Sequence, residues 1–241
     1  MHRLLVENIA GETVALTGEQ HHRATRVLRL GRGDRLRIFD GRGSEYETTI
    51  QTADRTQAML RIERQVGPVP EPQVRVTLLQ SVPRGDAMER VIQKCVEIGV
   101  AEIVPLITRR TVARASGEGT KLARWRKIAL HAVEQSGRAW LVPVAEPVTA
   151  DLAIPRLASC DLALVPHHGA AESLRSALGA AGRSQSVAIV IGPEGGFSPE
   201  EIARFAAARA RIVSLGPRVL RSETAGLVAA TLVLYHYGEM G

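Results

Sequence analysis

The chain has 241 residues, of which 45% are apolar, so it can bury one large hydrophobic core or two smaller ones. Its formal charge is +6, from 31 basic and 25 acidic side chains, and only three of the basic residues are lysines. The two cysteines, Cys95 and Cys160, are isolated in the sequence, which excludes a disulfide framework and a cysteine-based zinc site.

The excess of arginine favours a polyanionic partner, with nucleic acid the first candidate, because the guanidinium fork binds phosphate at two points. An arginine-rich proteome would give the same bias without any function, so charge alone leaves both interpretations open. No stretch reaches membrane-spanning length, and the first residues, MHRLLVENIA, contain no long apolar run. We therefore expect a cytoplasmic protein that has no membrane contact.

The N-terminal part of the chain is predicted to be rich in β-strands. Short alternating runs occupy Asp34–Asp40, Glu45–Gln51 and Gln57–Glu63, separated by turn-like segments. A helical interruption at Gly18–Leu30 precedes them. Four arginines in and just after this interruption could follow RNA phosphates, and a solvated basic face is the other interpretation: Arg23, Arg26, Arg29 and Arg32.

A stiff proline-rich linker, Gly67–Pro72, follows these strands. We place the domain boundary there, which gives a first domain at residues 1–69 and a second at residues 73–241. From Gln73 onward predicted strands alternate with predicted helices, and this alternation is typical of a parallel α/β sheet. The strands are Val74–Leu79, Ile103–Ile107 and Leu162–Val165, and the helices are Ala87–Ile98, Lys121–Gln135 and Ala171–Leu178.

In each of the next two strand–helix units, a glycine-proline loop joins the strand to the helix. The strand Val187–Ile191 leads into Gly192-Pro-Glu-Gly-Gly196, and the following helix should begin with Ser198 as N-cap and a capping box to Glu201. The strand Ile212–Leu215 leads into Gly216-Pro217. A second helix should follow this turn, with Ser222 as N-cap. Its apolar body at Ala225–Leu234 must be buried on every side, in a core or against a partner chain.

Together these loops predict two walls of one ligand site, because open α/β sheets bind ligands at the carboxyl ends of their strands. Either loop alone could be an ordinary strand–helix turn. The sequence contains neither a phosphate-binding P-loop motif nor a G-x-G-x-x-G motif after the first strand of a βαβ unit. The two loops therefore do not indicate a P-loop nucleotide site or a Rossmann dinucleotide site.

The paired segments IGPEGGFSPEEI and LGPRVLRSETAGLVA resemble the signature of the SPOUT methyltransferases. Three further stretches are similar to the ribosomal RNA small subunit methyltransferase E family within them. These are VLRLGRGDRLRIFDGRG at Val27–Gly43, ERVIQKCVEIGVAEIVPLITRR at Glu89–Arg110 and AVEQSGR at Ala132–Arg138. The resemblance implies a C-terminal α/β-knot, a trefoil-knotted parallel sheet, preceded by a small PUA-like β-barrel that binds RNA.

The same resemblance implies that S-adenosyl-L-methionine donates a methyl group to N3 of a uridine in 16S rRNA. It further implies a homodimer that acts on small-subunit rRNA or on the assembled subunit. The alternatives are a SPOUT enzyme that methylates another RNA position, such as a ribose 2′-hydroxyl, and a non-catalytic RNA-binding protein. Adjacent histidines point in different directions, so His21-His22 and His167-His168 are poor chelating pairs and we expect no metal.

Candidate cofactor-binding residues follow from the resemblance, residue by residue. A tight apolar loop can hold adenine through backbone groups, which requires glycines and aliphatic side chains. The candidates are Leu164, Gly192, Pro193, Glu194, Gly195, Gly196, Leu215, Gly216, Arg218, Val219 and Leu220.

Arg221 is the leading catalytic candidate. Methylation of N3 removes a proton and leaves negative charge on the uridine carbonyl oxygens, which a guanidinium can stabilise. Arg138 and Arg218 are second choices for this role. Glu223 could accept the proton, directly or through water, but an acidic residue is also favourable in the first turn of a helix.

Overall fold

The computed structural model describes residues 1–111 and 118–241, with side chains from Thr120 onward in the second range. Contacts group these residues into two units. The first contains Met1–Glu71 and Val133–Leu141, and the second contains Pro72–Ala132 and Val142–Gly241. The division after Glu71 lies close to the expected linker, whereas the sequence analysis did not place Val133–Leu141 with the N-terminal residues.

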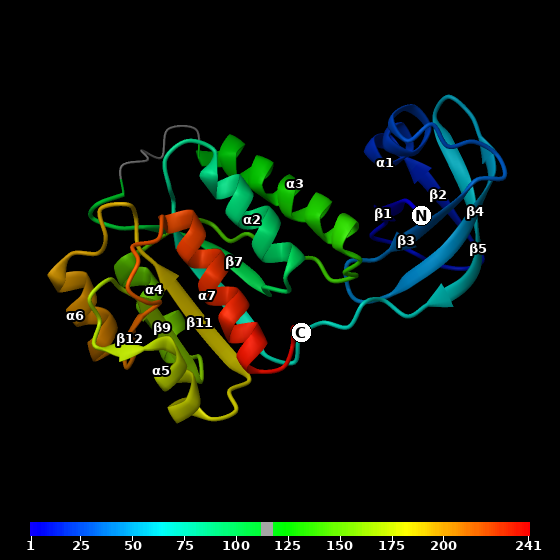
Figure 1. Cartoon of the computed structure of the whole chain (residues 1–241). Helices are drawn as coiled ribbons and strands as arrows, with labels where there is room; N and C mark the ends of the chain where they lie inside the picture. The colour runs from blue at the N-terminus through cyan, green and yellow to red at the C-terminus, as the bar shows by residue number, and fades with distance from the viewer. Residues whose placement is uncertain (112–117) are drawn as a thin grey trace. The chain divides into compact units, whose positions relative to one another are not determined.

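The first unit is a five-stranded curled sheet with the order β1-β3-β4-β5-β2 (Figure 1). Its neighbouring strands are antiparallel except for the parallel pair β1 and β3. A short helical segment, made of α1 (Gly18–His22) and η1 (Arg23–Val27), follows β2. The strands are β1 (Arg3–Leu5), β2 (Thr13–Thr17), β3 (Arg35–Phe39), β4 (Glu45–Ala53) and β5 (Gln57–Val66).

The core of this unit comes from the alternating residues of its strands, because successive side chains of a strand point to opposite faces. In β2, for example, Val14 and Leu16 are buried while Thr13, Ala15 and Thr17 are exposed. The sequence analysis predicted β3, β4 and β5 but not β1 or β2. The buried core residues are Leu4, Val14, Leu16, Ala24, Leu36, Ile38, Ile50, Ala58 and Leu60.

The second unit is built on a seven-stranded sheet with the order β10-β12-β9-β11-β6-β7-β8, and all of its strand pairs are parallel. The central strands are continuous apolar runs, as expected for strands covered on both faces. The strands are β6 (Arg75–Ser81), β7 (Glu102–Ile107), β8 (Val148–Thr149), β9 (Leu162–Pro166), β10 (Glu172–Ser173), β11 (Ser186–Ile191) and β12 (Arg211–Ser214).

Helices cover both faces of this sheet. Helix α7 packs against β6, β11 and α2, while α4 and α6 contact each other and cover the opposite face together with Phe197 and Phe205. Helix α4 was not predicted from the sequence. The helices are α2 (Ala87–Glu97), α3 (Glu118–Ser136), α4 (Ala150–Ala158), α5 (Leu174–Ala181), α6 (Pro199–Ala207) and α7 (Ser222–His236).

Two predictions about helix ends have different outcomes. The capping box of α6 is confirmed, because the Ser198 hydroxyl accepts from the Glu201 N–H and the Glu201 carboxylate accepts from the Ser198 N–H. The prediction that Ser222 caps α7 is wrong. Arg221 is the N-cap residue, and Ser222 is already in the first turn, where its hydroxyl bonds to another loop.

Helix α7 is not buried on every side within one chain, so the expected burial would require a partner chain. Gly226, Ala229 and Ala230 are buried against the sheet. Leu232 and Tyr235 are 41% and 66% exposed. Part of the apolar surface of this helix therefore stays uncovered in a single chain.

Candidate functional site

The candidate site lies at the carboxyl edge of the second unit's sheet. Strands β12, β9 and β11 are neighbours and parallel, so the loops that follow them leave the same edge. These loops contain His167-His168, Gly192–Gly196 and Leu215–Leu220. The sheet thus brings both glycine-proline loops to one side of the molecule, as the sequence analysis expected.

A pocket of about 90 Å³ lies between the loops after β9 and β12. Five predicted cofactor residues line it: Leu215, Gly216, Arg218, Val219 and Leu220. The rest of the lining is Pro166, His167, His168, Ser214 and Ala225. Apolar side chains and backbone form most of this wall, which suits a ligand held largely through shape and main-chain groups.

The backbone of the β12 loop needs glycine at one position. Gly216 has φ +117°, a conformation that side chains rarely allow, and nothing lies within 4 Å of where its Cβ would be. Its N–H donates to the Ser214 hydroxyl at 3.1 Å. Val219 is 74% exposed at the pocket. An aliphatic side chain is therefore available to a ligand without any rearrangement of the core.

The loop after β11 is held from several sides and does not line this pocket. The Glu194 carboxylate accepts from the Arg84 N–H at 3.0 Å, and the Gly195 carbonyl accepts from the Arg110 guanidinium at 2.8 Å. Glu194 therefore holds the loop. A Cβ at Gly195 would meet Arg110 at 3.6 Å, an ordinary contact, so this position has room for a small side chain.

A buried hydrogen-bond chain links the two loops. The Gln80 side-chain amide, at the end of β6, donates to the Ser222 hydroxyl at 2.9 Å, and that hydroxyl donates to the Gly192 carbonyl at 2.7 Å. The carbonyl can only accept, so the hydroxyl must accept from the amide nitrogen, which fixes the orientation of the Gln80 side chain. A Cβ at Gly226 would lie 2.4 Å from Gln80 Oε1, so only glycine fits there.

The sequence analysis did not identify Gln80. A glutamine directly after the apolar pair Leu78-Leu79 of a buried strand was the available signal, because a buried amide requires partners. It also did not identify Pro166 as a lining residue. Leu164, which it did propose, is fully buried inside β9 and lies two positions before the lining segment.

The catalytic candidates occupy different places. Arg221 is exposed and directly precedes α7, and Glu223 is half-buried in the first turn of that helix. Arg138 belongs to the first unit, where its buried guanidinium bonds the Glu71 carboxylate through Nε at 2.9 Å. This ion pair gives Arg138 a structural partner, so its contact with an acceptor base stays a prediction.

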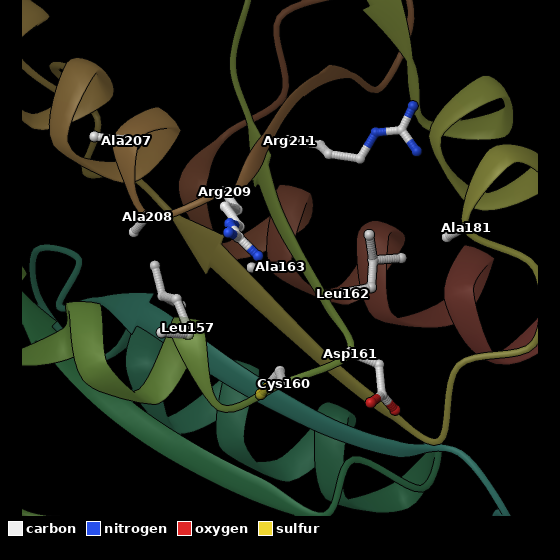
Figure 2. Close-up of a pocket in the computed structure, with 11 residues that line it drawn as sticks. Leu157, Cys160, Asp161, Leu162, Ala163, Ala181, Ala207, Ala208, Arg209 and Arg211 are labelled. Carbon is white, nitrogen blue, oxygen red and sulfur yellow. The ribbon is translucent and has the colours of Figure 1, made fainter.

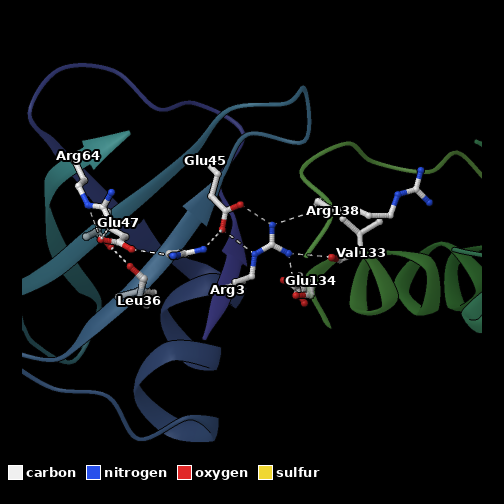
Figure 3. A network of polar contacts seen from close by, with 10 residues as sticks. Arg3, Leu36, Glu45, Glu47, Arg64, Val133, Glu134 and Arg138 are labelled. Atoms are coloured by element: carbon white, nitrogen blue, oxygen red, sulfur yellow. Dashed lines mark hydrogen bonds and ion pairs between the residues drawn. The ribbon is translucent and has the colours of Figure 1, made fainter. Parts of the chain in front are cut away.

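A polar network holds the Val133–Leu141 segment within the first unit (Figure 3). The Arg3 guanidinium bonds the Glu45 carboxylate at 2.9 Å and donates to the carbonyls of Val133, Glu134 and Arg138 at 2.9–3.0 Å. These acceptors satisfy the N–H donors of the Arg3 side chain, which is almost fully buried. Arg3 therefore caps the carboxyl end of α3.

The four predicted RNA-binding arginines also belong to the first unit. Arg23 is half-buried and pairs with the Glu134 carboxylate at 2.7 Å. Arg26, Arg29 and Arg32 are exposed. The structure thus leaves three of the four guanidinium groups on the surface and engages the fourth in an internal ion pair.

A pocket of about 550 Å³ lies at the opposite edge of the sheet, beside the amino ends of β9 and β12 (Figure 2). Its lining is rich in alanine, and two of its charged side chains, Asp161 and Arg211, are engaged within the fold. The Asp161 carboxylate accepts from the N–H groups of Ser186 and Gln185, which hold its pKa below the usual value. Arg211 pairs with Glu172. None of the predicted site residues lines this pocket, so its size does not identify the functional site.

The described residues contain neither a candidate metal site nor a candidate membrane span. Among residues 1–111 and 118–241, no group of three or more His, Cys, Asp or Glu side chains could hold a metal ion. In the same part of the chain, no helix is long and apolar enough to cross a membrane.

Comparison with known proteins identifies two matching family models. Residues 70–234 match an RNA methyltransferase domain, and residues 16–63 match an RNA methyltransferase PUA domain. A ribosomal RNA small subunit methyltransferase E from Synechocystis is 37% identical over 95% of this chain and 75% of its own length. A protein of the same name from Bacillus subtilis is 28% identical over 92% of this chain and 90% of its own length.

Solved structures are similar over nearly the whole chain. One is a methyltransferase from Legionella pneumophila in complex with the bound cofactor SAM, with a TM-score of 0.89 and 32% sequence identity. The match covers 97% of this chain and 96% of that chain. A ribosomal RNA small subunit methyltransferase E from Neisseria gonorrhoeae bound to S-adenosyl methionine has a TM-score of 0.88 at 30% identity, with 98% and 97% covered.

Proposed function

Because the chain belongs to the ribosomal RNA small subunit methyltransferase E family, we propose that it methylates N3 of a specific uridine in 16S rRNA. The family assignment makes it a methyltransferase of ribosomal RNA that uses S-adenosylmethionine. It also confirms the expected fold class, an N-terminal PUA domain followed by the SPOUT methyltransferase fold.

One observation carries the assignment of the cofactor site. The pocket between the β9 and β12 loops gathers five of the residues that the sequence analysis assigned to the cofactor. Its backbone turn at Gly216 and its exposed Val219 fit a purine ring and a ribose held without charged side chains. Leu215, Gly216, Val219 and Leu220 would hold the cofactor, whose sulfonium supplies the transferred methyl group.

The chain's own residues prepare the acceptor. Arg221 directly precedes α7 and is adjacent in the chain to Leu220, which lines the pocket. There its guanidinium would bind the uridine carbonyl oxygens, on which negative charge grows as N3 loses its proton. Glu223, half-buried in the first turn of α7, would accept that proton directly or through water.

The remaining parts of the proposal concern partners and place. We assign RNA binding to residues 1–69, with Arg26, Arg29 and Arg32 as exposed phosphate contacts, and methyl transfer to residues 73–241. The exposed apolar side chains of α7 support a homodimer. The substrate would be small-subunit rRNA or the assembled small subunit, and a cytoplasmic location follows from that substrate.

Nucleoside analysis tests the proposal. Small-subunit rRNA, free and in assembled subunits, would be incubated with the protein and isotopically labelled S-adenosylmethionine, then digested and analysed by mass spectrometry. We expect label in 3-methyluridine. Label in a 2′-O-methylated nucleoside would identify a different acceptor, and RNA binding without label would indicate a non-catalytic protein.

A further inference from the structure

Two arginines that no part of the sequence analysis singled out flank the loop after β11. Arg84 follows the end of β6, and Arg110 follows the end of β7. The Arg84 N–H donates to Glu194 at 3.0 Å, and the Arg110 guanidinium donates to the Gly195 carbonyl at 2.8 Å. Both residues therefore contact adjacent positions of one loop at the carboxyl edge of the sheet, and both are exposed.

The charges of these two side chains are not balanced by acidic partners. Several other exposed arginines of the second unit pair with carboxylates, as Arg90 does with Asp86, Arg109 with Glu200 and Arg124 with Glu89. Within the described residues, no carboxylate forms an ion pair with the guanidinium of Arg84 or Arg110. Arg218 and Arg221, after β12, add two more exposed guanidinium groups at the same edge.

The hydrogen bonds of Arg110 hold its side chain in place and leave most of its N–H donors free to bind a ligand. One nitrogen, Nη1, donates to the carbonyls of Gly195 and Phe197 at 2.8 and 3.5 Å. A guanidinium has five N–H donors in a planar fork, so most of them still face solvent. A positioned arginine loses less conformational entropy when it binds an anion than a freely rotating one.

We propose that Arg84 and Arg110 form a phosphate-binding pair on the second unit, which holds the backbone of the RNA strand that carries the acceptor base. This inference rests on the proposed function for the identity of the partner as RNA. Phosphate is the expected ligand because unpaired guanidinium groups on exposed loops bind the RNA backbone independently of sequence. RNA would then be held at the methyl-transfer site itself, in addition to the first unit.

The salt dependence of RNA binding tests this pair. Binding of a small-subunit rRNA fragment would be measured by fluorescence anisotropy over a series of KCl concentrations. The variants are Arg84→Ala, Arg110→Ala and the double variant. Each lost phosphate contact should lower the magnitude of the log–log slope by about 0.7–0.9, and the double variant by about twice that amount.

Matched controls separate phosphate contact from charge and from loop structure. Arg90→Ala removes the same charge from an exposed arginine that already pairs with Asp86, so its slope should equal that of the unmodified chain. Arg84→Lys and Arg110→Lys should keep most of the slope, because an ammonium still binds phosphate as a point charge. Calorimetric titration with S-adenosylmethionine should give unchanged affinity for Arg84→Ala.

Two results would overturn the inference. One is a slope for the double variant equal to that of Arg90→Ala, and the other is the absence of measurable RNA binding by the unmodified chain. Failure of the proposed function is seen separately, as absence of methylated nucleoside. A lowered slope in a chain that does not methylate rRNA would leave the phosphate-binding pair in place and remove only the proposed reaction.

Discussion

At the scale of single residues, the Ser222 hydroxyl is the contact that joins the two glycine-proline loops. It accepts from Gln80 and donates to Gly192 in a buried environment. We expect Ser222→Ala to lower the free energy of unfolding by about 1–3 kcal/mol, because the Gly192 carbonyl loses its donor. Urea denaturation measures this change, and calorimetric titration should show weaker S-adenosylmethionine binding.

Ser81 provides the control for that prediction. Its hydroxyl is fully buried next to Gln80, and it has no hydrogen-bond partner within the described residues. Replacing an unsatisfied buried hydroxyl removes a desolvation cost, so Ser81→Ala should be neutral or slightly stabilising. Equal destabilisation by Ser81→Ala and Ser222→Ala would mean that the hydrogen-bond chain is not the cause.

Arg221 should act on the methyl-transfer step rather than on stability. Its side chain is exposed and caps no helix end through a side-chain bond. Arg221→Ala should lower the single-turnover rate by about 10²–10³, the effect of losing one preorganised donor to a developing anion. Arg221→Lys should recover part of the rate. Equal losses of rate, cofactor affinity and melting temperature would instead assign Arg221 a structural role.

At the scale of elements, Asp161 connects the start of β9 to the start of β11. Its carboxylate accepts from the N–H groups of Ser186 and Gln185 at 2.9 and 2.8 Å, and these bonds lower its pKa. Because the pKa is lower in the folded state, the carboxylate stabilises the fold above its unfolded pKa. That stabilisation is lost as the pH falls through the folded value.

Asp161→Asn should therefore be less stable than the unmodified chain at neutral pH. The difference should shrink as the pH falls below about 4, the usual value for aspartate, because protonated Asp161 then resembles asparagine. Urea denaturation of both proteins across this range measures the effect. A difference that persists at the lowest pH would show that charge is not its origin.

At the scale of the whole molecule, the first unit needs a segment from far along the chain. Arg3 donates to three carbonyls of Val133–Arg138, and the Trp140 ring lies where a Cβ at Gly43 would be. Removal of residues 1–69 should leave S-adenosylmethionine binding mostly intact but abolish rRNA methylation. Amide hydrogens at Val133–Leu141 should then exchange faster, as mass spectrometry can measure.

Arg3→Ala in the full chain is the control for this truncation. It removes the cap of α3 but leaves the exposed arginines of the first unit in place. We expect faster exchange at Val133–Leu141 together with retained RNA binding. If Arg3→Ala abolished RNA binding as completely as the truncation, loss of the arginines would not explain the truncated protein's behaviour.

The exposed apolar side chains of α7 give a prediction about assembly. Leu232→Asp should convert the proposed homodimer to a monomer, because a charge would have to be buried at the interface. Leu152→Asp in α4 is the matched control, since Leu152 is 66% exposed and lies on another helix. Sedimentation at micromolar concentration measures both, and a monomeric unmodified chain would contradict the proposal.

The features that the sequence alone determined depend on residues that are close together along the chain. The capping box of α6 spans three positions, and the apolar runs of β9 and β11 mark buried strands without knowledge of their neighbours. The glycine-proline loops could be proposed for the same reason, whereas the cofactor residues after β12 were carried over from the family resemblance. Gly216, with its positive φ, is a local requirement of a turn.

Only the tertiary structure decided which distant residues meet. Gln80 and Ser222 are 142 positions apart, and Arg3 reaches carbonyls that are 130 to 135 positions away. Ser222 looked like a helix cap in the sequence because a hydroxyl before an apolar helix usually binds that helix's own N–H groups. In the fold the hydroxyl instead accepts from Gln80 and donates to the carbonyl of Gly192, in the loop after β11. Buried polar groups bind whatever partner the packing brings to them, and that partner is not encoded by their neighbours in the chain.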